Sequence, residues 1–179
     1  MKVIINTDEQ TVEVQEDGRA KWAPLYSDEA YELLSHITLK VGWNQKVPYT
    51  YSWMGFPILQ IPDDMIRMAE VITRLRPEVI VETGVAHGGS LIFYASLLKA
   101  MGYDGRVIGI EKGLRCRAQI EAHPLAERIM LIVGDSVAPD IVGVVHDMCA
   151  HTNKVLVILD SCHSYQHVAN ELMAYHDLV

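Results

Sequence analysis

Asp160 and His163 are the residues of this chain whose types and spacing most directly suggest chemistry. They lie three positions apart and follow an apolar run at residues 155–159. A carboxylate beside an imidazole suits proton transfer, because histidine has an unperturbed pKa of about 6.5 and changes charge near neutral pH. The alternative interpretation is a helix N-cap followed by a histidine on the protein surface.

An earlier apolar run is followed by a glycine-rich segment, Glu82-Thr83-Gly84-Val85-Ala86-His87-Gly88-Gly89-Ser90. Its glycines allow a tight turn and a close approach of a ligand to the backbone, and the helix expected after it offers free N–H groups. Glu111 ends the next apolar run, where its carboxylate can accept hydrogen bonds from both hydroxyls of a ribose. Asp135 and Ser136 follow the third run, where they can read the amino group of an adenine. Together these groups predict a nucleoside site.

Two nucleoside-containing cofactors fit this pattern. Residues 84–89 can be aligned with the dinucleotide-binding glycine motif, with Ala86 at the second glycine, and Glu111 then lies at a suitable distance for the ribose of NAD. Glu82 favours the other cofactor, S-adenosylmethionine, because a carboxylate two residues before Gly84 repels a pyrophosphate and attracts an ammonium or sulfonium group. An NAD-dependent oxidoreductase remains the alternative.

The apolar runs and the segments between them predict the elements that position these groups. Four short runs are rich in β-branched residues and lack polar alternation, which is typical of strands buried on both faces. Helical patterns separate them, and this alternation predicts a doubly wound, Rossmann-like α/β fold with a parallel sheet. Ligands bind such a sheet beyond the carboxyl ends of its strands. The expected strands are residues 79–81, 107–110, 129–133 and 155–159, and the expected helices are at about 90–101, 114–122, 138–150 and 164–176, with an earlier one that Asp63 caps and Pro77 ends.

Residues 1–62 form an N-terminal region ahead of the expected cofactor-binding domain at residues 63–179. The pattern of residues 1–26 predicts a β-hairpin. Ser27 predicts the N-cap of an amphipathic helix that runs to about Leu39. The aromatic-rich, proline-containing loop that completes the region is expected to pack over the core.

The composition excludes several classes of protein. Of the 179 residues, 50% are hydrophobic and 21% are charged, and the mean hydropathy of +0.12 is too high for a disordered segment. A formal charge of −8 with scattered basic residues argues against a nucleic-acid partner. No apolar run is long enough for a membrane span and the N-terminus lacks a signal-peptide pattern, so we expect a cytoplasmic protein. The three cysteines fit neither a disulfide framework nor a paired-cysteine zinc site.

Four stretches of the chain carry a family resemblance. They are YTYSWMGFPILQIP at residues 49–62, VETGVAHGGSLI at 81–92, EAHP at 121–124, and LDSCH at 159–163 with His167-Val168. From about residue 30 to its end, the chain resembles the cephalosporin hydroxylase and rhamnosyl O-methyltransferase family. The resemblance implies a class I S-adenosylmethionine-dependent methyltransferase that acts on a hydroxyl of a sugar or a natural product, in lipid or natural-product biosynthesis, with Mg²⁺.

The same resemblance implies roles for single residues. The aspartate that matches Asp160 binds the metal, and the histidine that matches His163 is the general base. Mg²⁺ on the substrate oxygen would lower the pKa of the hydroxyl, and His163 would take its proton. Relatives use their N-terminal elements to cover the substrate, as a lid, and to form a homo-oligomer. The cofactor-binding residues expected from the strand ends and the resemblance together are Glu82, Thr83, Gly84, Ala86, His87, Gly88, Ser90, Glu111, Asp135, Ser136 and Asp160.

Three alternatives remain open at this point. A hydroxylase is less expected, since no iron triad, flavin loop or haem ligand is visible. His163, His167 and Glu171 are spaced by four and could share a helix face that imitates a zinc site. Only four strands are expected, and the family's other metal-binding acidic residues lie beyond the fourth, so Asp160 has no visible carboxylate partner. The sequence is therefore either the front portion of a longer protein or a truncated, non-catalytic cofactor-binding or scaffold protein whose open strand edge a partner covers.

Overall fold

The computed structural model describes residues 1–179 and divides into two compact units, Met1–Val47 and Pro48–Val179. The sequence pattern placed the boundary at residue 62 instead. The structure assigns residues 48–62 to the second unit, because the aromatic segment within them packs against the hydrophobic core of that unit. No helix combines the length and the apolar character that crossing a membrane requires.

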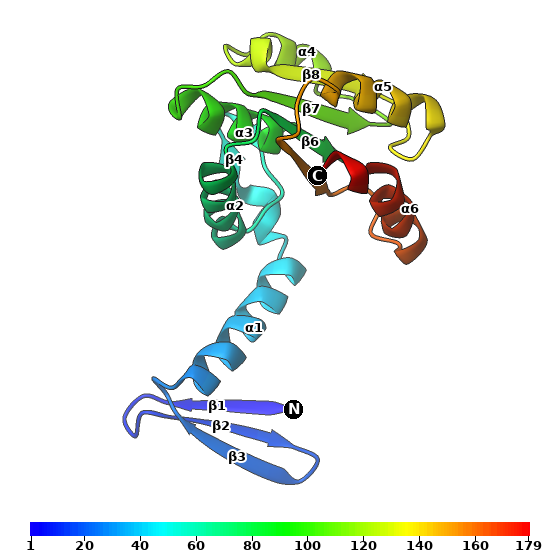
Figure 1. Cartoon of the computed structure of the whole chain (residues 1–179). Helices are drawn as coiled ribbons and strands as arrows, with labels where there is room; N and C mark the ends of the chain where they lie inside the picture. The colour runs from blue at the N-terminus through cyan, green and yellow to red at the C-terminus, as the bar shows by residue number, and fades with distance from the viewer. The chain divides into compact units, whose positions relative to one another are not determined.

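The first unit begins with a three-stranded antiparallel sheet in the order β1-β2-β3 (Figure 1). The expected hairpin is β1 with β2, and the sequence analysis missed the third strand. This strand turns back on β2 through Asp17 and Gly18, which both take a positive φ, of 50° and 74°. A two-residue Asp-Gly turn of this kind matches the twist of a hairpin. The strands are β1 (Lys2–Asn6), β2 (Thr11–Glu16) and β3 (Arg19–Pro24).

Helix α1 (Asp28–Asn44) completes the first unit. It begins where the sequence predicted, because Ser27 Oγ accepts a hydrogen bond of 3.2 Å from the backbone N–H of Ala30. It continues past Leu39 to Asn44, further than the apolar periodicity indicated. Ala30 is its one buried residue, and Leu33, Leu34 and Ile37 are partly buried.

The second unit is built on a parallel sheet in the order β8-β7-β6-β9, which confirms the doubly wound α/β class. The central strand β6 is buried along its whole length, as the unbroken apolar pattern predicted. The outer strands β8 and β9 are only partly buried, because each has a neighbouring strand on one side alone. The strands are β6 (Val79–Thr83), β7 (Arg106–Glu111), β8 (Ile129–Val133) and β9 (Val155–Leu159).

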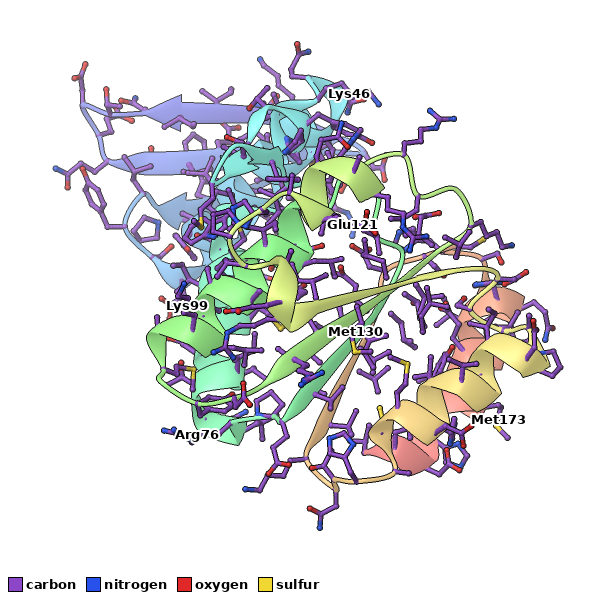
Figure 2. The ribbon with its side chains drawn as sticks, turned by 90° about the horizontal axis from the view of Figure 1, so that it is seen from above. Lys46, Arg76, Lys99, Glu121, Met130 and Met173 are labelled. Atoms are coloured by element: carbon purple, nitrogen blue, oxygen red, sulfur yellow. The ribbon has the colours of Figure 1, made fainter.

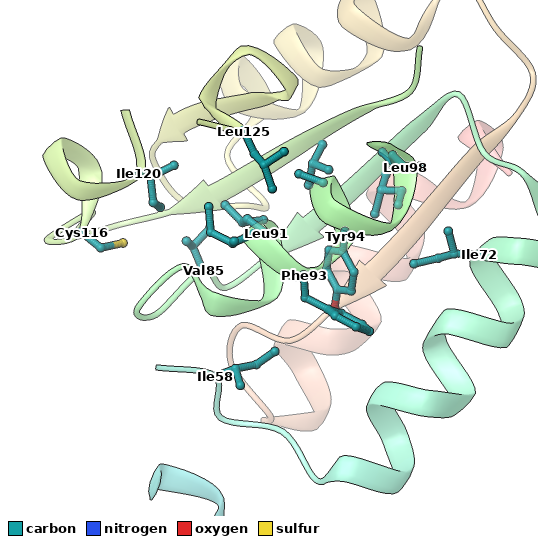
Figure 3. Packing of buried hydrophobic residues seen from close by; sticks show 14 residues of the cluster. Ile58, Ile72, Val85, Leu91, Phe93, Tyr94, Leu98, Cys116, Ile120 and Leu125 are labelled. Carbon is teal, nitrogen blue, oxygen red and sulfur yellow. The ribbon is translucent and has the colours of Figure 1, made fainter. Parts of the chain in front are cut away.

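Helices cover both faces of this sheet (Figure 2). One core cluster joins the sheet to α2, α3 and α4, and its buried side chains include Ile80, Tyr94 and Ile120 (Figure 3). The other joins the opposite face to α5 and α6. The helices are α2 (Pro62–Leu75), α3 (Gly89–Ala100), α4 (Arg117–Glu121), α5 (Pro139–Cys149) and α6 (Tyr165–Tyr175), and the 3₁₀ turns are η1 (Val47–Thr50), η2 (Ala126–Arg128) and η3 (His176–Leu178). Of the predicted helices, α4 is clearly shorter than expected.

The aromatic segment forms a small hairpin, β4 (Ser52–Trp53) with β5 (Phe56–Pro57), rather than an entirely irregular loop. Trp53 anchors it on α3 in two ways. Its Nε1–H donates to Ser96 Oγ at 3.0 Å, and its ring meets that of Phe93 edge-on at 5.0 Å. Tyr51, Trp53 and Phe56 therefore pack against the core as expected, whereas Tyr49 is 50% exposed. Helix α2 follows and starts with Pro62 at its first position, so Asp63 is inside the helix and is not its cap.

Candidate functional site

A pocket of about 240 Å³ lies where the carboxyl ends of the four parallel strands converge. Its walls come from the segments that follow β6, β7, β8 and β9, and from α6. Larger hollows lie within the first unit, at about 1090 Å³, and near the amino ends of β6 and β7, at about 740 Å³. The lining of the strand-end pocket is Gly84, Ala86, Ile110, Glu111, Lys112, Gly134, Ser136, Asp160, Ser161, Cys162 and His167.

The glycines after β6 pack closely against other parts of the chain, and Gly84 also lines the strand-end pocket. Gly84 has a φ of +86°, and a Cβ there would collide with the backbone of Asp160. A Cβ at Gly89 would collide with the backbone of Pro57. At Gly88, with a φ of +83°, a Cβ would collide with the side chain of Ile120. The segment is therefore fixed by close contacts with the β9 loop, the aromatic segment and α4.

Glu82 is fully buried on β6 and lines neither of the hollows beside the glycine segment. Its carboxylate accepts hydrogen bonds from Ser90 Oγ at 2.6 Å and from Tyr94 OH at 3.1 Å, both on α3. Burial raises the pKa of Glu82 to about 8, and the nearby charge of Asp160 acts in the same direction. Glu82 was expected to contact a cationic ligand directly. Its carboxylate does not line the strand-end pocket, and its hydrogen-bond partner Ser90 lines the smaller hollow beside the glycine segment.

Three further predicted residues lie around the glycine segment. Thr83 is buried, and its hydroxyl oxygen has no hydrogen-bond partner. His87 and Ser90 line a small second hollow of about 30 Å³, together with Asp160 and residues 57–60 of the aromatic segment. This hollow and the strand-end pocket share Gly84, Ala86 and Asp160, so the glycine segment separates two parts of one site.

Glu111 lies at the end of β7, in the pocket wall, as predicted. Its Oε2 accepts the backbone N–H groups of Val85 and Ala86, each at 3.2 Å. Its Oε1 accepts the backbone N–H of Gly113 at 3.3 Å. The carboxylate therefore holds the glycine segment in place, a role that sequence reasoning did not indicate. Ala86 takes a positive φ of 47° in this arrangement.

Asp135 and Ser136, which follow β8, point to different neighbours. Asp135 forms an ion pair with Lys112, with Nζ and Oδ2 2.8 Å apart, and that hydrogen bond lowers the pKa of Asp135. It does not line the pocket. Ser136 does, and it is buried, with its Oγ 2.6 Å from Glu171 Oε1. Of the two groups expected to read an adenine, only Ser136 faces the pocket.

Asp160 and His163 lie together just beyond β9. His163 Nε2 is 3.6 Å from Asp160 Oδ1, and the two side chains are 80% and 43% exposed. Partial burial raises the pKa of Asp160, and the neighbouring His163 opposes this rise. Neither residue belongs to α6, whose N-cap is Ser164, so the alternative of a simple helix cap at Asp160 is wrong.

The structure gathers no group of three or more His, Cys, Asp or Glu side chains that could hold a metal ion. The hypothesis of a zinc site on the last helix is therefore wrong. His163 precedes that helix and is exposed. His167 and Glu171 lie within it, the first partly buried and the second fully buried, with His167 Nε2 3.3 Å from Glu171 Oε1.

Among the pocket-wall residues that have polar side chains, sequence reasoning missed four, Lys112, Ser161, Cys162 and His167. Their positions directly after β7 and β9, or on the first turn of α6, are the signal that could have identified them. Cys162 is exposed, and its Sγ lies 3.5 Å from Ser164 Oγ. Hydrogen bonds that the thiolate accepts from Ser164 lower the pKa of the thiol.

A family model described as Rhamnosyl O-methyltransferase/CmcI matches residues 45–179. Among curated proteins, the chain is 29% identical over 133 residues to the rhamnosyl O-methyltransferase of Mycobacterium leprae (strain TN). The matched segment covers 73% of this chain and 54% of that protein. It is 26% identical over 125 residues to the rhamnosyl O-methyltransferase of Mycobacterium tuberculosis (strain H37Rv). That match covers 68% of this chain and 49% of the relative. The chain thus spans about half the length of the curated relatives that it matches.

Solved structures of CmcI have a similar fold. A CmcI structure with Mg-SAM superposes with a TM-score of 0.55 and 30% identity, over 69% of this chain and 51% of that chain. The apo structure of CmcI gives a TM-score of 0.53 and 31% identity, over 73% and 53%. These comparisons agree with the Rossmann-like sheet described above.

Proposed function

Because the chain belongs to the Rhamnosyl O-methyltransferase/CmcI family, we propose that it binds S-adenosylmethionine and transfers the methyl group to a hydroxyl of a sugar or a natural product, with the help of Mg²⁺. The observation that carries this proposal is the pair of Asp160 and His163. Asp160 lines the strand-end pocket, and the imidazole of His163 lies 3.6 Å from its carboxylate. A proton acceptor thus stands at the rim of a pocket suited to a nucleoside.

The charges around the glycine segment suit a cationic cofactor. Glu111 and Asp160 place two carboxylates beside it, which favour a sulfonium and an ammonium over a pyrophosphate. Glu111 also retains capacity to bind a ribose, because its Oε1 accepts only one backbone N–H and has a second lone pair. We therefore expect Glu111 to bind one ribose hydroxyl while it holds the glycine segment.

Asp160 fits one ligand position of a hydrated Mg²⁺. Its carboxylate is 43% exposed, and its one partner among the ion pairs is the imidazole of His163. Burial raises its pKa, an effect that a bound cation would oppose. Mg²⁺ is commonly held by one or two carboxylates, with waters and substrate oxygens in the other positions. Asp160 would therefore bind the ion together with water and the acceptor.

The mechanism follows from these positions. When bound, S-adenosylmethionine supplies the electrophilic methyl group and Mg²⁺ lowers the pKa of the acceptor hydroxyl. His163 removes the hydroxyl proton as the oxygen attacks. The carboxylate of Asp160 stabilises the imidazolium that results. Glu111 and the glycine segment orient the nucleoside end, which fixes the direction of attack.

A second candidate function is cofactor binding without turnover on the same fold. The observation that favours it is that the structure gathers no group of three or more His, Cys, Asp or Glu side chains that could hold a metal ion. The NAD-dependent oxidoreductase and the hydroxylase are not favoured, because the matched family model and the curated relatives carry the names of methyltransferases.

We also propose that the N-terminal region forms a homo-oligomer contact. Trp22, Tyr26 and Tyr31 of the first unit are 61%, 82% and 74% exposed, and Ala30 is the one buried residue of α1. Large exposed aromatic side chains are enriched at interfaces. Light scattering tests this proposal: we expect a mass of at least two chains, and a monomer at every concentration would contradict it.

Methyl transfer from labelled S-adenosylmethionine to a panel of sugars and phenols tests the main proposal. We expect Mg²⁺-dependent transfer to at least one acceptor, and loss of that transfer in Asp160→Ala. Calorimetric titration separates the candidates. Binding of S-adenosylmethionine without transfer would support the non-catalytic protein, and tight NAD binding without a response to S-adenosylmethionine would contradict both.

A further inference from the structure

A buried carboxylate behind the strand-end pocket joins three separate segments. Glu171 of α6 is fully buried, and its Oε1 accepts the hydroxyls of Ser136 and Ser161, each at 2.6 Å. The ring Nε2 of His167 lies 3.3 Å from the same oxygen. The other oxygen, Oε2, has no hydrogen-bond partner. One carboxylate oxygen therefore connects the ends of β8 and β9 to the last helix.

The three partners of Glu171 are all part of the pocket wall, whereas Glu171 is not. Ser136 and Ser161 use their hydroxyl protons on Glu171. Asp135, the acceptor expected here from the sequence, is paired with Lys112 and does not line the pocket. His167 also belongs to this wall and lies near Ser136. Its Nε2 faces Glu171, so its second ring nitrogen, Nδ1, can bind a ligand.

The neighbours of His167 decide which of its ring nitrogens carries hydrogen. Nε2 lies between Glu171 Oε1 at 3.3 Å and Ser136 Oγ at 3.2 Å. A carboxylate can only accept, and the Ser136 hydroxyl already donates to it, so Nε2 must be the donor here. In the neutral ring, Nδ1 is then an acceptor. A nucleoside ligand can satisfy that acceptor with an amino group.

We propose that His167 is a specificity-determining residue that accepts a hydrogen bond from the 6-amino group of adenine at Nδ1, and that Glu171 is the positioning residue that fixes its tautomer. The inference rests on the S-adenosylmethionine site proposed above. It moves the reading of adenine from Asp135 to α6. It also gives Glu171 a role beyond attachment of that helix, because the carboxylate determines which ring nitrogen is free.

The test compares two ligands. One is S-adenosylhomocysteine, and the other is its analogue that carries hydrogen in place of the 6-amino group of the adenine. Calorimetry on the full chain measures both dissociation constants. We expect the unchanged protein to bind the amino form about tenfold more tightly, the usual size of one hydrogen bond to a buried acceptor. His167→Phe, which keeps a ring of similar size, should bind both ligands within about twofold of each other.

Two variants of Glu171 separate positioning from simple packing. Glu171→Gln keeps an oxygen that accepts from Ser136, Ser161 and His167, so the preference for the amino form should remain. Glu171→Leu removes the acceptor and should abolish the preference. His151→Phe is the matched control, since His151 is exposed and lies by the hollow near the amino ends of the strands. It should bind both ligands as the unchanged protein does.

The outcomes distinguish this inference from the function on which it rests. If the unchanged protein binds the two ligands equally, or if His167→Phe weakens both and keeps their ratio, the inference is wrong and the cofactor site stands. If the unchanged protein binds neither ligand, the proposed function is wrong as well. If Glu171→Leu does not fold, His167→Phe and Glu171→Gln still decide the question.

Discussion

The hydroxyl of Ser90 donates a hydrogen bond of 2.6 Å to the fully buried carboxylate of Glu82. This bond links the first turn of α3 to the centre of the sheet, just below the glycine segment. A buried carboxylate that loses a donor retains the full penalty of its desolvation. The bond therefore stabilises both the fold and the position of the glycine segment.

Replacement of Ser90 by alanine should lower the free energy of unfolding by about 1 to 3 kcal/mol, because Oε2 of Glu82 would lose its partner in the interior. Urea denaturation measures the change. Ser52→Ala is the control, since Ser52 is exposed on β4, and it should change stability by less than about 0.5 kcal/mol. Equal effects of the two substitutions would contradict the role of the bond.

The pH dependence of stability should report the buried Glu82. Its pKa is about 8 in the folded protein against a usual value of 4.5, so the folded state binds more protons than the unfolded state between these values. The stability linked to this group is present below the unfolded pKa and is lost as the pH rises through the folded pKa. Between pH 5 and 8 the free energy of unfolding should fall with a slope of up to about 1.4 kcal/mol per pH unit.

Glu82→Gln removes the titrating group and should flatten this slope. Urea denaturation at several pH values measures it for both proteins. The control is Glu127→Gln, because Glu127 is exposed, and this variant should keep the slope of the unchanged protein. An equal slope in all three proteins would show that Glu82 does not titrate in this range.

The positions of the strands were predictable from the sequence, and the direction of single side chains was not. Runs such as residues 155–159 are apolar throughout, which marks a strand but carries no alternation to indicate which face each residue occupies. Glu82 was expected to face a cationic ligand because of its place two residues before Gly84, and no local pattern indicated that its carboxylate accepts hydrogen bonds from α3. The contact between Ser136 and Glu171 spans 35 positions and depends on how α6 packs, so no local pattern could indicate it.

Removal of the imidazole at position 163 tests the proposed proton acceptor. His163→Gln should lower kcat for methyl transfer by about 100-fold or more, since general base catalysis contributes at least that factor. The affinity for S-adenosylhomocysteine should stay within about twofold, because His163 does not line the strand-end pocket. His151→Gln replaces an exposed histidine near the opposite ends of the strands and should leave both values unchanged. A normal kcat in His163→Gln would show that another group removes the proton from the acceptor hydroxyl.

Two glycines provide the sharpest test of how the pocket is built. Gly84→Ala should destabilise the protein by about 2 kcal/mol or more, because φ is +86° and the new Cβ would collide with the backbone of Asp160, which cannot rotate away. Gly143→Ala, within α5 and with no atom near its Cβ, should instead stabilise by about 0.5 to 1 kcal/mol. Thermal and urea denaturation measure both changes. Since Gly84 brings the β6 and β9 loops together, Gly84→Ala should also weaken binding of S-adenosylhomocysteine, whereas unchanged binding would show that the contact with Asp160 does not shape the pocket.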